Sequence, residues 1–194
     1  MTVTTTTAPL SRTVEGRLVP SPGTYQIDVT HTTVDFVARH LMVAKVRGTF
    51  RDVQGTLVVG ESPEESSLDV IVGMASVDTR EEARDTHLRS ADFFDVENFP
   101  TMTYVATAVR PKGDRWIAEG QLTIHGNTRP VALAIEFLGS IGDPWGGARI
   151  AFSASGEIDR EEFGLTWNAA IETGGVVVSK VIKIEIEAEL VHKA

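Results

Sequence analysis

Apolar and polar residues alternate along most of this chain with the two-residue period that is typical of β-strands. The clearest example is residues 182–190, where three isoleucines, Ala188 and Leu190 share one face, and Lys183 and three glutamates share the other. Comparable alternation or strand composition occurs in residues 24–29, 33–41, 46–59, 67–77, 101–109, 115–124, 130–138 and 148–158. Eight or more such segments, joined mostly by short turns, predict an antiparallel sandwich or barrel.

A closed barrel is the form that removes exposed strand edges. We therefore expect an all-β antiparallel fold, either a sandwich or, if the sheet closes, a barrel of about eight strands. A barrel of about this size either fills with side chains or encloses one small ligand. Large and small residues are mixed on the expected inward faces, with Phe36 beside Ala38 and Trp116 beside Ala118 and Gly120. This mixture is compatible with an internal space and equally with an ordinary core.

A single segment, residues 78–100, has the features of a helix rather than a strand. Thr79 is a suitable N-cap, and Glu82 three residues later completes the sequence pattern of a capping box. Pro100 restricts the residue before it and marks the far boundary. We predict one short helix near residues 79–92, placed against the sheet as a plug or lid.

The chain divides into residues 1–22, expected to be a disordered tail, and residues 23–194, expected to be one domain. The threonine-rich start lacks the apolar region of a secretory signal, so a cytoplasmic location is expected. Turn residues around Pro20 and Gly23 separate the tail from the first strand.

Composition excludes several kinds of partner and of chemistry. The 194 residues have a formal net charge of −9, which argues against nucleic acid and anionic membrane surfaces as partners. No apolar run approaches the roughly 20 residues of a membrane-spanning helix. There is no cysteine, and the five histidines do not show a metal-binding spacing, so no metal site is expected. No nucleophile elbow or glycine-rich phosphate loop is present, so we do not expect an enzyme.

Five blocks of the sequence, taken in order, resemble the YceI-like family of lipocalin-like polyisoprenoid-binding barrels. They are residues 25–31, 37–50, 85–100, 120–126 and 158–165, and the similarity extends over roughly residues 23–192. The most distinctive block is DTHLRSADFFD, residues 85–95. One departure is Thr32, where serine usually follows the histidine in this family; the hydroxyl is retained.

The resemblance implies an antiparallel eight-stranded lipocalin-like barrel whose long apolar tunnel takes an isoprenoid chain, such as a quinone tail or a polyprenyl lipid, or another long-chain amphiphile. The expected function is non-catalytic binding, transport or storage, without a cofactor, and a homodimer is possible by the same resemblance. The candidate tunnel residues are Phe36, Phe50, Met74, Phe93, Phe94, Tyr104, Trp116, Leu122, Phe137, Phe152 and Trp167. The candidate polar residues at the tunnel mouth are His40, Asp85, His87 and Arg89.

Each polar candidate also has a structural interpretation. His40 points inward by strand parity and would contact either a ligand head group or a neighbouring protein group. Asp85 and His87 would otherwise cap or anchor the helix, and Arg89 would be an exposed helix residue. Asp159, Arg160 and Glu162 are expected to form a salt-bridged strand end. Two alternative functions remain open: a small barrel enzyme that uses a His40–Asp85 pair on a lipid-like substrate, and an interaction dimer with a filled core.

Overall fold

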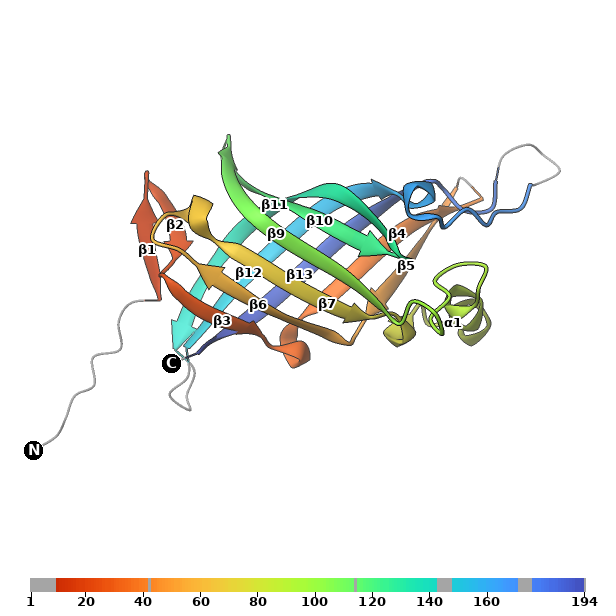
Figure 1. Cartoon of the computed structure of the whole chain (residues 1–194), viewed down its shortest axis with the longest axis horizontal. Helices are drawn as coiled ribbons and strands as arrows, with labels where there is room; N and C mark the ends of the chain where they lie inside the picture. The colour runs from red at the N-terminus through yellow and green to blue at the C-terminus, as the bar shows by residue number, and fades with distance from the viewer. Residues whose placement is uncertain (1–9, 42, 114, 143–147, 171–175, 194) are drawn as a thin grey trace, which may run out of the picture.

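Eight strands of the described chain close into an antiparallel barrel with one helix at its end (Figure 1). The computed structural model describes residues 10–41, 43–113, 115–142, 148–170 and 176–193. The barrel strands are β3 (Gly23–Ile27), β6 (Val53–Val59), β7 (Ser67–Gly73), β9 (Thr101–Lys112), β10 (Arg115–Ile124), β11 (Asn127–Gly142), β12 (Ala148–Asp159) and β13 (Val181–Lys193). The ring closes because β13 pairs with both β12 and β3. The expected eight-stranded lipocalin-like barrel is confirmed.

Three shorter strands lengthen the barrel at one end. They are β4 (Thr33–His40), β5 (Ala44–Phe50) and β8 (Val77–Asp78). β3 and β4 lie end to end along the same partner, because the C-terminal part of β13 pairs with β3 and its N-terminal part pairs with β4. A 3-10 turn, Val29–His31, interrupts the two strands. Likewise, β5 comes just before β6 in the chain, and β8 comes just after β7. The pairings of β4 with β5 and of β5 with β8 therefore extend those of β3 with β6 and of β6 with β7.

Strand alternation sorts the side chains of β13 as the sequence predicts. Its isoleucines, Ala188 and Leu190 face the barrel interior. The charged face meets ion-pair partners on nearby strands: Lys183 contacts Glu157 of the adjacent β12 at 3.4 Å, and Glu185 contacts Arg47 of β5, beyond β4, at 2.6 Å. The barrel wall is therefore apolar inside and charged outside along this strand.

The helix is shorter than predicted, and its N-cap is a different residue. Helix α1 spans Glu82–Arg89, and the side chain of Glu81 accepts a hydrogen bond from the backbone N–H of Ala83 at 3.3 Å. The predicted capping box of Thr79 and Glu82 is wrong. Thr79 lies outside the helix because its backbone N–H and its hydroxyl both donate to the carboxylate of Asp85, which is inside the helix.

The predicted disordered tail is wrong for residues 11–20, which form the hairpin of β1 (Ser11–Val14) and β2 (Arg17–Pro20). Its two-residue loop, Glu15 and Gly16, has positive φ at both positions, which matches the twist of a tight hairpin. The predicted domain boundary at residue 23 therefore excludes an ordered part of the fold; residues 1–9 lie outside the described residues.

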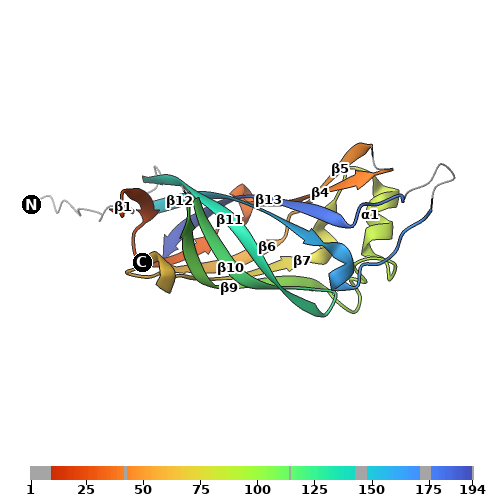
Figure 2. The same cartoon turned by 90° about the horizontal axis from the view of Figure 1, so that it is seen from above.

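The hairpin and the helix lie at opposite ends of the barrel, and both views agree on this (Figures 1 and 2). The hairpin is anchored by Arg12, which donates to the carbonyl of Gly60 at 3.0 Å, and by burial of Val19. In the part of the chain that the structure describes, no helix is long and apolar enough to cross a bilayer.

Candidate functional site: an apolar cavity with a basic mouth

The barrel encloses a cavity of about 410 Å³ with an almost wholly apolar lining. This volume lies within the range of roughly 300–1,000 Å³ that is common for small-molecule sites. Its wall is formed by inward residues of the barrel strands, and its far end is bordered by α1 and by Leu165, Trp167, Val177 and Val178. The interior is therefore not filled by side chains.

Eight of the eleven candidate tunnel residues border this cavity. They are Phe36, Phe50, Phe93, Phe94, Tyr104, Leu122, Phe152 and Trp167. Their contributions come from separate strands, from the residues after α1 and from the segment after β12. Closure of the barrel brings them together.

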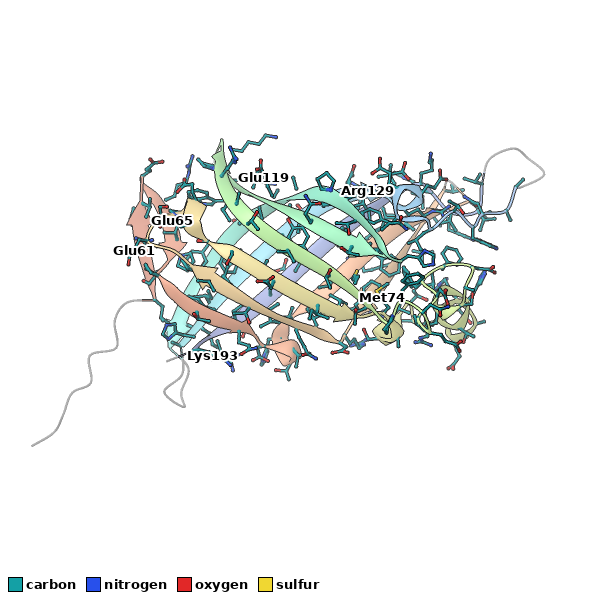
Figure 3. The ribbon with its side chains drawn as sticks, viewed as in Figure 1. Glu61, Glu65, Met74, Glu119, Arg129 and Lys193 are labelled. Carbon is teal, nitrogen blue, oxygen red and sulfur yellow. The ribbon has the colours of Figure 1, made fainter. Side chains whose placement is uncertain are left out.

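Met74, Trp116 and Phe137 do not border it. Met74 is buried in the core where β7 ends, near the helix end of the barrel (Figure 3). Trp116 and Phe137 border a separate space of about 60 Å³ beneath the β1–β2 hairpin. Strand parity predicted that these side chains point inward, but their height along the barrel axis places them above or below the cavity.

Of the four polar candidates, His40 and His87 border the cavity. His40 is exposed at the end of β4, and no carboxylate of the described residues is hydrogen-bonded to it. His87 is held in place, since its Nε2 lies 2.9 Å from a carboxylate oxygen of Asp92. Its ring also meets Trp167 edge to face, with centroids 4.7 Å apart. An aromatic cluster of His87, Phe93 and Trp167 thus lies beside the mouth of the cavity.

Asp85 and Arg89 do not border the cavity and instead fasten the helix to the barrel. Asp85 is 7% exposed and accepts hydrogen bonds from Thr79. Arg89 donates to the backbone carbonyls of Ala75 at 2.9 Å and Val77 at 2.7 Å. The contacts support a structural role for both residues, and the His40–Asp85 pair on which the enzyme alternative depended is not formed.

Arg84 and Arg160 border the cavity and were not among the predicted site residues. Arg84 donates from Nε to the hydroxyl of Thr79 at 2.7 Å and from Nη2 to its carbonyl at 2.9 Å. Both arginines therefore present cationic groups that are positioned by backbone or hydroxyl oxygens rather than by carboxylates.

Arg160 was expected in a salt-bridged strand end, and that expectation is wrong. Its side chain is buried, with the residue 2% exposed, whereas the nearby Asp159 and Glu161 pair outside with Lys180 at 3.7 and 2.8 Å. Burial lowers the pKa of the Arg160 guanidinium from its ordinary value, against the opposing influence of Glu161 and Asp159. Strand alternation could have predicted this position, because Ile158 faces inward and Arg160 follows it by two residues.

A cluster of charged groups lies elsewhere, where β3 meets the turn before β4. Ligand atoms of Asp28, His31 and Glu189 lie within 4.8 Å of one another. The guanidinium of Arg149 is hydrogen-bonded to Asp28 and lies 3.3 Å from Glu189, so it already compensates these carboxylates. Arg149, followed by Thr30, holds the pKa of Asp28 well below its usual range. The cluster is an ion-pair network at a strand junction.

Comparison with known proteins supplies the family context. The model of the YceI-like domain matches residues 25–190. Protein YceI of Salmonella newport is 40% identical over 145 residues, 73% of this chain and 76% of that protein. The crystal structure of the Campylobacter jejuni YceI protein gives a TM-score of 0.68 at 31% identity, covering 80% of this chain and 90% of that one. A polyisoprenoid binding domain from Saccharophagus degradans shares the fold, with a TM-score of 0.64 at 15% identity, covering 89% of this chain and all of that one.

Proposed function

The chain belongs to the YceI-like family, and we propose that it binds the apolar chain of an isoprenoid lipid, or of a similar amphiphile, and carries or stores it inside the barrel. The observation behind this proposal is the apolar cavity of about 410 Å³. The structural relative from Saccharophagus degradans, described as a polyisoprenoid binding domain, points to the same ligand class.

The cavity is expected to hold one long apolar chain, and burial of each methylene group contributes about 0.8 kcal/mol. Association costs of at least about 4 kcal/mol are subtracted from that gain. Chains of farnesyl or palmityl length are therefore suitable probes of binding.

Two observations favour a carrier over the alternatives. Asp85 is engaged by Thr79, so the acid–base pair that an enzyme would need is missing at His40 among the described residues. A filled interaction core would leave no space of this size inside the barrel.

The test is native mass spectrometry of the freshly purified protein, followed by organic extraction and mass analysis of what is released. We expect a co-purified prenyl or long-chain amphiphile, or, for delipidated protein, one-to-one uptake of added farnesol or hexadecanol. Delipidated protein that takes up neither alcohol, nor longer prenols, nor a quinone would overturn the proposal.

A further inference from the structure

The mouth of the cavity is basic, although the protein as a whole is acidic. The charged or titratable side chains that border the cavity near α1 and the end of β4 are Arg39, Arg84, Arg160, His40 and His87. The only acidic residue bordering the cavity, within the described chain, is Asp35, which is paired with Arg47 at 3.1 Å. With a formal net charge of −9 overall, this local excess of cationic groups is not expected from composition.

Arg160 is the buried member of this group. Its Nε donates to the carbonyl of Ser179 at 3.0 Å, and its Nη1 donates to the carbonyl of Leu165. These two bonds hold the guanidinium in one orientation. Its Nη2 is buried and has no acceptor among the described residues. A buried charged donor without an acceptor is costly, and native proteins rarely keep one without a reason.

The charge of Arg160 is also uncompensated by an ion pair within the described chain. The carboxylates next to it in sequence, Asp159 and Glu161, are directed to Lys180. Asp159 additionally caps the following 3-10 turn by accepting from the N–H of Glu161 at 2.9 Å. The guanidinium that borders the apolar cavity is therefore fixed in place, and for its buried Nη2 the described residues supply no acceptor.

We propose that Arg160 binds the anionic head group, a phosphate or a carboxylate, of the amphiphile whose chain occupies the cavity. This inference rests on the proposed lipid binding and adds the class of head group and the direction of the ligand, with its head at the helix end. Guanidinium groups make their strongest hydrogen bonds to such oxygens, and they do so most effectively where water is excluded. The exposed Arg39 and the partly buried Arg84 add positive potential at the same end.

The test compares ligands that share a chain and differ in the head. Farnesyl phosphate is measured against farnesol, and palmitate against hexadecanol, by isothermal titration below the critical micelle concentration. For the wild-type protein we expect each anion to bind at least tenfold more tightly than its alcohol. Arg160→Gln should reduce this ratio to about one while leaving the affinity for the alcohols within threefold. Arg160→Lys, which keeps the charge but loses the planar fork, should give an intermediate ratio.

Arg129→Gln is the matched control, because it removes the same charge from an exposed residue of β11 (Figure 3). It should leave the ratio at the wild-type value. If the wild type binds alcohols as tightly as anions, the head-group assignment is wrong while lipid binding stands. If no chain binds at all, the proposed function fails first. An unchanged ratio in Arg160→Gln, with alcohol binding intact, would also overturn the assignment.

Inorganic phosphate separates a lipid head-group site from a free-anion site. We expect 10 mM phosphate to leave farnesyl phosphate binding nearly unchanged, because chain burial supplies most of the affinity. Phosphate that binds alone as tightly as farnesyl phosphate would instead identify a site for the free anion and overturn the proposal.

Discussion

The ring of Tyr104 in β9 lies directly against the backbone of Gly120 in β10. A Cβ atom on Gly120 would be 2.6 Å from Cζ of Tyr104 and 2.8 Å from its hydroxyl oxygen. The same hydroxyl oxygen lies 3.1 Å from the carbonyl oxygens of both Ala118 and Val131, which share its single proton. Gly120 follows a register shift between the two strands. Because it has no side chain, the ring of Tyr104 can pack against the β10 backbone beside the cavity.

Gly120→Ala should therefore destabilise the protein by about 1–3 kcal/mol, the usual cost of overpacking. The added methyl meets both the Tyr104 ring and the carbonyl of Val105, and the backbone cannot move away as easily as a side chain. Urea unfolding gives the value. Gly156→Ala is the matched control, because its closest contact is the tip of Leu133, which can rotate; the cost should be smaller. Equal costs at the two glycines would contradict the packing argument.

Tyr104 should make stability depend on alkaline pH. Desolvation raises its pKa to about 12, with a smaller contribution from Glu119. Since the folded pKa is above the ordinary value of about 10, the stabilisation is complete below pH 10 and is lost as the pH rises toward 12, by up to about 3 kcal/mol.

Tyr104→Phe should lose about 1–2 kcal/mol at pH 7 through the missing hydrogen bonds, and should show a flatter decline between pH 10 and 12. Unfolding free energies at several pH values measure both effects. Parallel pH curves for the two proteins would show that Tyr104 does not titrate as inferred.

The Asp28–Arg149 pair should matter in acid. The pKa of Asp28 is depressed, so its contribution is present above about pH 4 and is lost as the pH falls through the folded pKa. Asp28→Asn should cost about 1–3 kcal/mol at pH 7, and this difference should shrink as the pH is lowered from 4 to 2. Thermal unfolding at pH 7, 4, 3 and 2 tests this expectation. A difference that stays constant over this range would remove the pair as its source.

Chain binding should be abolished by a charge in the cavity wall. Leu122 is 6% exposed and borders the cavity, so Leu122→Asp places a carboxylate against the bound chain. Ile71→Asp is the control, because Ile71 of β7 is 52% exposed and does not border the cavity. Farnesol uptake should disappear in the first variant and persist in the second.

Ala154→Phe covers the case in which Leu122→Asp does not fold, since it narrows the same cavity with an apolar group. It should weaken farnesol binding at least tenfold. Uptake that survives in a folded Leu122→Asp variant, or in Ala154→Phe, would place the chain outside the barrel.

His40→Ala should weaken lipid binding only a few-fold. His40 borders the cavity but is exposed at its mouth, so it buries little of the bound chain. Titration with farnesyl phosphate measures the change. Complete loss of binding, while Leu122→Asp retains it, would refute the cavity as the binding site.

Local pattern was sufficient to predict an antiparallel sandwich or barrel, and the family resemblance favoured the barrel. A strand residue's face follows from whether its position is odd or even, so alternation in β13 specified which side chains enter the core. Short turns between such segments then predicted antiparallel neighbours. The same rule placed His40 on the inward face, whereas in the structure His40 borders the cavity but is exposed at the end of β4.

Only the closed structure decided how far along the barrel each inward residue lies. For this reason Met74, Trp116 and the half-buried Phe137 lie away from the cavity, whereas Arg160, two residues after the inward Ile158, borders it. Alternation specifies only whether the side chain of a given strand residue faces the interior or the solvent. Height, burial and hydrogen-bond partners depend on strands distant in the sequence, and barrel closure brings those strands together.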